Sequence, residues 1–291
     1  MMATIIVNTL ISGLLVGIMY GMTGIGLTFT MGFGKTMNVA QGTLIVLGSF
    51  ILLSLYTKFH MNPFLGLVVV IVAFGLLGGF LDRVLLTYLR SKSDTITLLV
   101  LFGVAQVITN ITSWVYSANT VSLTTGMTQQ SLQVGPIMVS TVQVWVAIVG
   151  VVLMALLWAY LRSTAMGKMI RATAQSEDAM ALCGLDVRRA RTMIFVIGVA
   201  LAGIAGFGLA MLFPFSPQDQ DAWLIISFVV VVLGGVDNLL TTLAAGVLLG
   251  VLQTLAGLWL PFSDQNLVVY AVLALALIWR SRTAMLRYRS I

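Results

Sequence analysis

The sequence predicts an all-α fold, a polytopic transmembrane helical bundle of about eight or nine spans. Its 291 residues are 59% hydrophobic and only 8% charged, whereas a soluble globular domain carries about 25% charged residues. The mean hydropathy is +1.07, and several uncharged runs reach the roughly 20 residues that cross a bilayer. These three observations exclude a soluble enzyme, a disordered chain and a nucleic-acid-binding protein.

The charge balance is basic, with 15 Lys and Arg against 9 Asp and Glu and a net charge of +6. In a membrane protein such an excess belongs to the cytoplasmic loops, where Lys and Arg orient the helices. The single cysteine, Cys183, and the single histidine, His60, rule out an internal disulfide and a His/Cys metal cluster. We therefore expect no metal or cofactor on this chain and no nucleic-acid partner.

The apolar runs give nine candidate spans within a single transmembrane domain, residues 1–291. The first run has no basic leader, so we expect a span there rather than a cleaved signal. The runs at 222–235 and 243–260 are short, so half-helices or one broken pair are expected there, and a count of eight spans stays open. The candidate spans are 5–31, 39–57, 64–82, 96–117, 142–161, 192–213, 222–235, 243–260 and 265–280.

A break separates the first two spans. Phe33-Gly34-Lys35-Thr36 resembles the end of a phosphate-binding loop, but Phe29 stands where that loop has its first glycine, and no strand precedes it. We expect a helix end there rather than a nucleotide site. The chain is thus expected to carry no ATPase activity of its own.

The second span opens with the polar residues Asn38, Gln41 and Thr43. A helix that starts there directs its first N–H groups into the membrane or along its inner face, which suits a polar or anionic solute. We expect these side chains to line a substrate path, with hydrogen bonding between helices as the alternative. Other polar residues expected to face the bundle interior are Gln106, Asn110 and Gln253.

Glycines recur at intervals of four residues, which places a small surface on one helix face and lets helices approach closely. The three series are Gly13/Gly17/Gly21, Gly75/Gly79 and Gly246/Gly250.

Basic residues gather in the connections 83–95 and 162–191 and in the C-terminal tail. The connection 162–191 holds six basic and three acidic residues, whereas 117–143 holds none of either. This pattern predicts that 83–95, 162–191 and the C-terminus are cytoplasmic. With nine spans the N-terminus then lies outside.

A short helix is predicted at 176–184, inside the longest connection. Ser176 suits its N-cap, Gly184 suits its C-terminal end, and the two acids between them suit its positive first turn. Its small and apolar side chains suit a groove on a partner protein, with a helix lying on the membrane surface as the alternative. The residues expected to make that contact are Ser176, Glu177, Asp178, Ala179, Leu182 and Gly184.

The loop from Gly167 to Asp186 reads GKMIRATAQSEDAMALCGLD. It strongly resembles the cytoplasmic loop of the LivH-type permeases, inner-membrane subunits of bacterial ABC importers for branched-chain amino acids and related solutes. The likeness covers nearly the whole chain in order. Its other stretches are Gly17–Gly21, Asn38–Gly42, Phe195–Gly198, Ala202–Gly206 and Val232–Val236.

The resemblance implies a multi-pass protein of the bacterial inner membrane without catalytic chemistry. The helix at 176–184 would be the coupling helix, seated on separate ABC ATPase subunits that bind ATP and Mg²⁺. A second, related permease (or a second copy of this chain) would complete the path, and a periplasmic substrate-binding protein would deliver the solute. Transport would proceed by ATP-driven alternating access.

One departure leaves the solute open. The family commonly has Asn-Phe-Ala-His-Gly-Glu where this chain has Asn-Val-Ala-Gln-Gly-Thr, starting at Asn38. An amide and a hydroxyl thus replace an imidazole and a carboxylate, so urea, short amides and small organic acids stand beside amino acids as candidates. A stand-alone channel or an ion-coupled secondary transporter is the alternative function.

Overall fold

The computed structural model describes residues 2–90, 92–126, 130–134, 137–236, 238–260 and 265–288. Most of these residues are helical. The long helices are α1 (Met2–Thr28), α2 (Gln41–Phe59), α3 (Pro63–Leu81), α5 (Asp94–Tyr116), α6 (Thr141–Ser163), α9 (Val187–Leu212), α10 (Gln220–Gly234), α11 (Leu239–Ala256) and α12 (Gln265–Tyr288).

The shorter elements join or extend these helices. Two π-helical segments, η1 (Phe29–Phe33) and η2 (Asp82–Leu86), continue α1 and α3. The others are α4 (Thr87–Leu89), β1 (Ser131–Val134), β2 (Ile137–Ser140), α7 (Ala165–Gln175), α8 (Glu177–Leu182) and the 3-10 helix η3 (Pro217–Asp219).

All nine apolar runs found in the sequence are helical in the structure, which confirms the helical bundle. Within the described residues, seven helices are long and apolar enough to cross a membrane. The 15 residues of α10 extend only about 22 Å at 1.5 Å per residue, less than the ~30 Å hydrocarbon core. A half-helix is therefore confirmed at 220–234, whereas α11, with 18 residues, is long enough to be a span.

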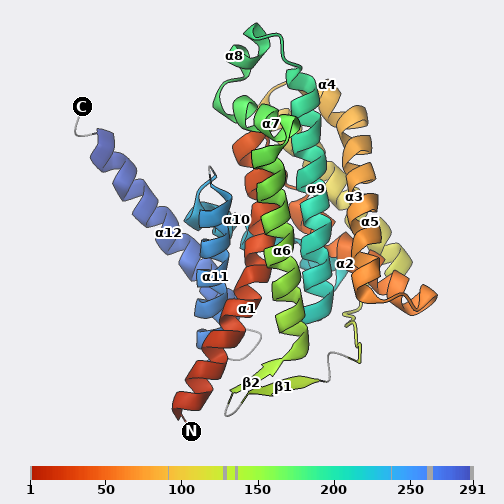
Figure 1. Cartoon of the computed structure of the whole chain (residues 1–291), viewed down its shortest axis with the longest axis vertical. Coiled ribbons are helices and arrows are strands. Elements are labelled where there is room, and N and C mark those ends of the chain that lie inside the picture. Colours follow the sequence, from red (N-terminus) through yellow and green to blue (C-terminus); the bar gives the residue numbers. More distant parts are fainter. Residues whose placement is uncertain are drawn as a thin grey trace.

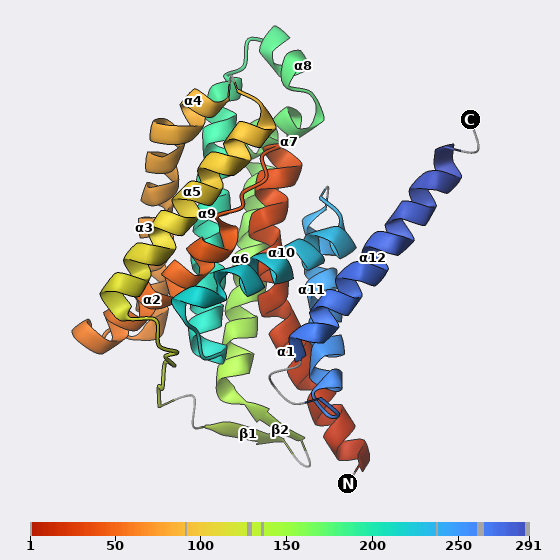
Figure 2. The same cartoon turned by 180° about the vertical axis from the view of Figure 1, so that it is seen from behind.

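Helix α9 lies at the centre of the bundle and packs against α1, α2, α3 and α6 (Figure 1). In its most apolar stretch 72% of the residues are buried, against 22% for α5 at the periphery. The short α10 crosses the interior between α2 and α11, as the reverse view shows (Figure 2). Helix α9 therefore links most of the bundle to the loop that precedes it.

The most extensive helix contact joins α1 to α11 through glycines. A Cβ atom added to Gly246 would overlap the backbone of Gly21, and one added to Gly250 would overlap that of Gly17. The close packing predicted for these two glycine series is thus confirmed. The prediction is wrong for Gly75, because no atom of the described residues lies within 4 Å of a Cβ added there.

The two ends of the molecule differ in charge. The N-terminus and the β1–β2 hairpin lie at one end, and the basic loop with α7 and α8 lies at the other (Figure 1). The uncharged segment between the spans predicted at 96–117 and 142–161 contains that antiparallel hairpin, with Ser131 paired to Ser140. A bridge between Val121 and Phe215 ties the same segment to the connection after α9.

Candidate functional site

The loop between α6 and α9 folds as two short helices. Helix α7 is capped by Thr164, whose hydroxyl accepts from the backbone N of Gly167 at 2.9 Å. Helix α8 is capped by Ser176, whose hydroxyl accepts from the N of Ala179 at 3.2 Å. Gly184 follows α8 with φ +72°, a left-handed conformation that glycine adopts without strain. The short helix and both of its predicted end residues are therefore confirmed.

Only one side of α8 packs against the protein. Met180 is 3% exposed, and its sulfur accepts from the hydroxyl of Thr173 on α7 at 2.9 Å. Leu182, by contrast, is 90% exposed, and Asp178 and Ala179 are exposed as well. Thus α8 is anchored to α7 and leaves an apolar and acidic face uncovered.

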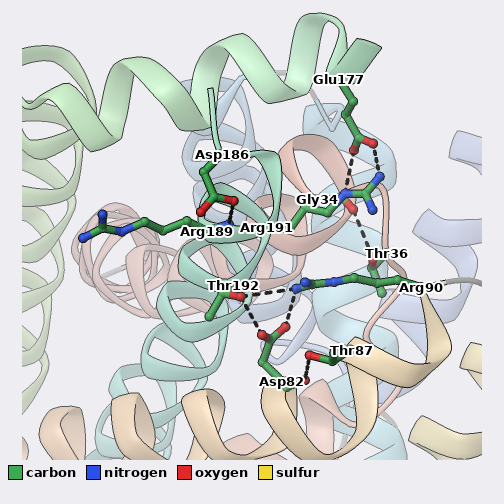
Figure 3. Close-up of polar contacts among 10 residues, drawn as sticks. All are labelled: Gly34, Thr36, Asp82, Thr87, Arg90, Glu177, Asp186, Arg189, Arg191 and Thr192. Atoms are coloured by element: carbon green, nitrogen blue, oxygen red, sulfur yellow. Dashed lines mark hydrogen bonds and ion pairs between the residues drawn. The ribbon is translucent and has the colours of Figure 1, made fainter. Parts of the chain in front are cut away.

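An ion pair joins α8 to the first turns of α9. Arg191 donates from Nε to Oε1 of Glu177 at 3.1 Å and from Nη2 to Oε2 (Figure 3). The planar guanidinium matches a carboxylate in this two-bond arrangement and so fixes orientation as well as distance. Glu177 therefore holds α8 against α9 in addition to its place in the first turn of the helix.

A second, buried cluster joins the next residue of α9, Thr192, to the junction of α3 and α4. Thr192 donates to Oδ2 of Asp82 at 2.6 Å, and Nη2 of Arg90 contacts Oδ1 of the same carboxylate at 2.6 Å (Figure 3). The Asp82 side chain is only 2% exposed, so its charge depends on these two donors. The hydroxyl of Thr87 donates to the Asp82 backbone carbonyl at 3.0 Å, inside the π-helical segment η2.

The two clusters use consecutive residues of α9, Arg191 and Thr192. They connect α8 on one side with the junction of α3 and α4 on the other. Sequence reasoning found Glu177 but missed Asp82, Arg90 and Thr192. The eight-residue separation of Asp82 and Arg90 gave no signal, because the turn that joins them includes a π-helical segment.

The interior polar site lies at the start of α2. Asn38 and Gln41 are fully buried and Thr43 is 4% exposed. The Asn38 amide donates to Oε1 of Gln41 at 3.4 Å. Thr43 donates to Oε1 of Gln220 on α10 at 2.6 Å, and Thr109 on α5 donates to the same oxygen. The three predicted residues therefore all lie inside the bundle, with Asn38 bonded to Gln41 and Thr43 bonded to Gln220.

One donor in this interior site has no partner. The Nε2 atom of Gln41 is buried without a hydrogen bond, and it lies where a Cβ on Gly26 would be. A buried amide without a partner is costly unless a bound molecule satisfies it. Asn38, Gln41 and Thr43 line neither the cavity beneath α8 nor the cavity beside Phe213 and Pro214.

The polar residues of α5 are arranged differently from the prediction. Asn110 is exposed, and its amide donates to the backbone carbonyl of Gln106 on its own helix at 2.7 Å. Thr109, one residue earlier, reaches the interior instead, because successive residues of a helix are about 100° apart. The expectation that Asn110 faces the interior is therefore wrong, whereas Gln253 on α11 is buried as expected. Among the described residues no cluster of three His, Cys, Asp or Glu could hold a metal ion.

Residues 9–278 match the family described as the permease component of branched-chain amino acid transport systems. The chain belongs to this family. It is 25% identical over 283 residues to the high-affinity branched-chain amino acid permease LivH of Salmonella typhimurium, covering 92% of this chain and 91% of that protein. It is 27% identical over 242 residues to the probable LivH of Methanocaldococcus jannaschii, covering 79% and 75%. A solved structure, PsaBC from Streptococcus pneumoniae in complex with Fab, covers 92% of this chain and 89% of its own with a TM-score of 0.48 and 17% identity.

The family match confirms the LivH-type resemblance. It also agrees with the fold, since permease components are membrane-spanning subunits of transport systems rather than enzymes. The match runs from residue 9 in the first third of α1 to residue 278 in α12 and so includes both the α7–α8 loop and the interior polar site.

Proposed function

We propose that this LivH-type permease is the transmembrane subunit of a bacterial ABC importer that moves a small polar solute by ATP-driven alternating access. The observation that carries the proposal is α8, which exposes Leu182 and is tied to α9 through Glu177 and Arg191. ATP and Mg²⁺ would bind partner ATPase subunits. A second, related permease or a second copy of this chain would complete the path, and a periplasmic binding protein would deliver the solute.

In this proposal the loop 162–191 and the C-terminus face the cytoplasm of the bacterial cell, with the N-terminus and the β-hairpin outside. The basic residues of the α7–α8 loop support that orientation, because Lys and Arg accumulate on the cytoplasmic side of membrane proteins.

The coupling step follows from the contacts of α8. The ATPase surface would receive the face formed by Asp178, Ala179 and Leu182, while the caps at Ser176 and Gly184 hold the helix in shape. When the ATPases close, α8 moves, and the bidentate pair of Glu177 carries that motion into α9. Since α9 packs against α1, α2, α3 and α6, a shift of α9 repositions the helices of the path.

We assign the path to the polar start of α2, formed by Asn38, Gln41 and Thr43. The buried and unpartnered Nε2 of Gln41 is a donor that suits a carbonyl or carboxylate oxygen of the solute. The names of the relatives give branched-chain amino acids as their solutes. Other amino acids, urea, short amides and small organic acids carry the same carbonyl or carboxylate oxygen and are candidates for this chain too.

The test is co-purification of the full chain from its native membrane, followed by ATP-dependent uptake in proteoliposomes. We expect ATPase subunits and a permease partner to be recovered with the chain. Leu182→Asp and Ala179→Arg should each abolish ATPase recovery, because both place charge on the exposed face of α8. Leu132→Asp, a matched change at an exposed leucine of β1, should leave recovery intact.

Two results would overturn the proposal. One is ATPase recovery and uptake that survive both α8 variants. The other is solute flux through the purified chain alone, without ATP, which would favour a channel or an ion-coupled transporter.

A further inference from the structure

A cavity of about 280 Å³ lies beneath α8, between the ends of several helices. The π-helical segments η1 and η2 contribute Thr30 and Asp82 to its lining, and the start of α5 contributes Thr97. Glu177 and Arg191 close the side toward α8 and α9. Its volume is near the lower limit of ligand pockets and suits a small polar group.

The charges of the lining do not cancel. Four of its side chains are basic and three are acidic. The carboxylates of Asp82 and Glu177 are both engaged by arginines. Lys35 and Lys92 take part in neither of the two ion pairs found in the described residues, and Asp94 is the only acid of the lining left to balance them.

An unused hydrogen-bond donor in the lining also favours an anion. Nη1 of Arg90 is buried and has no partner, although Nη2 of the same guanidinium is bonded to Asp82 and Thr192. A guanidinium nitrogen without a partner favours an anion, because a charged donor makes strong hydrogen bonds to phosphate oxygens.

Lys35 has a left-handed backbone conformation, which is strained for a residue other than glycine. Its φ is +51°, a left-handed value that is uncommon for lysine and that clusters at functional sites. This backbone places the residue in the turn between η1 and α2, on the cavity wall.

We propose that this cavity binds the phosphate group of an anionic ligand, held by Lys35, Lys92 and the free nitrogen of Arg90. The phosphate belongs either to an acidic phospholipid or to a free small molecule. The outer surface beside the cavity suits a lipid tail, because Tyr88 and Leu99, which adjoin the lining residues Leu89 and Leu98, are 73% and 66% exposed. Basic pockets between transmembrane helices bind lipid headgroups in this way. The proposal concerns this chain alone and does not depend on an ATPase partner.

The test measures phosphate binding to the purified full chain in a neutral detergent. Phosphatidylglycerol is titrated and counted by native mass spectrometry, with phosphatidylcholine as the uncharged reference, and inorganic phosphate is titrated by calorimetry. The double variant Lys35→Asn, Lys92→Gln removes both lysines, and asparagine tolerates the left-handed backbone at 35. Lys168→Gln, an exposed lysine of α7 outside the cavity, is the matched control.

We expect phosphatidylglycerol to bind the wild-type chain more tightly than phosphatidylcholine. Its affinity should fall by about fivefold for each lysine removed and should not change in Lys168→Gln. Thr97→Phe, which fills the cavity without altering its charge, should weaken binding too and guards against a folding defect in the double variant. If inorganic phosphate shows these losses and phosphatidylglycerol does not, the ligand is a free phosphate. If neither ligand responds to the double variant or to Thr97→Phe, the proposal is overturned.

Discussion

Arg191 holds both carboxylate oxygens of Glu177, and the residue after it, Thr192, donates to the buried carboxylate of Asp82. Two adjacent positions of α9 thus bind the helix that projects from the bundle and the junction between α3 and α4. A displacement of α8 must therefore either move this part of α9 or break the ion pair between Glu177 and Arg191.

Arg191→Lys should weaken the proposed transfer of motion from α8 to α9 while keeping a positive charge at position 191. Lysine offers no planar fork to the Glu177 carboxylate, and a partly exposed ion pair contributes up to about 1 kcal/mol, so we expect solute moved per ATP hydrolysed to fall by up to about fivefold. The measurement is uptake and ATP hydrolysis by the complete transporter in proteoliposomes. Arg189→Lys is the control, since only the backbone N of Arg189 is bonded to Asp186. An unchanged ratio in Arg191→Lys would remove Glu177 from the coupling step.

Asp82→Ala should destabilise the chain by about 3 to 5 kcal/mol, because it leaves Arg90 largely buried without a counter-charge. The measurement is thermal unfolding of the purified chain in detergent, followed by circular dichroism. The double change Asp82→Ala, Arg90→Met should recover much of the loss, since it removes the unpaired charge as well. A double variant no more stable than Asp82→Ala would show that the ion pair is not the cause.

Gly246→Ala should destabilise the contact between α1 and α11 by about 1 to 3 kcal/mol, because its methyl group would overlap the backbone of Gly21. Gly75→Ala is the matched control on α3, where no atom lies within 4 Å of the added carbon. Unfolding midpoints of the two variants in the same detergent give the comparison. Equal losses in both would show that close packing at Gly246 is not the cause, since alanine favours a helix more than glycine does.

Gln220→Leu should cost about 1 to 3 kcal/mol, because the buried hydroxyls of Thr43 and Thr109 both lose their acceptor. Asn110→Leu, a polar-to-apolar change at an exposed position of α5, should have little effect. Thermal unfolding distinguishes the two variants, and solute uptake then reports whether the site is also part of the path. A large loss in Asn110→Leu alone would place the important amide on the outer face of α5.

The sequence was sufficient for the long apolar helices and for the ends of α8, but not for α7. Long apolar runs leave few alternatives to spans in a bilayer, and Ser176 and Gly184 act through backbone geometry within a few residues. The burial of Asn38, Gln41 and Thr43 followed from the cost of exposing polar groups to lipid.

The contacts of Asp82 could not be found in that way. Thr192 is 110 residues away from it, and only the packing of α3 against α9 brings the two together. Gly75 and Asn110 were misplaced because the sequence period shows which residues share a helix face but not toward which neighbour that face turns.

The contact between α1 and α11 also has a consequence for biosynthesis. The hydroxyls of Thr28 and Thr242 lie 3.2 Å apart although 214 residues separate them in the chain. At about 5–20 residues per second, a ribosome needs roughly 10–40 s to make that interval. During this time the glycine face of the first helix enters the membrane without its partner, so the nascent protein must keep that face covered by lipid or by the insertion machinery until the end of translation.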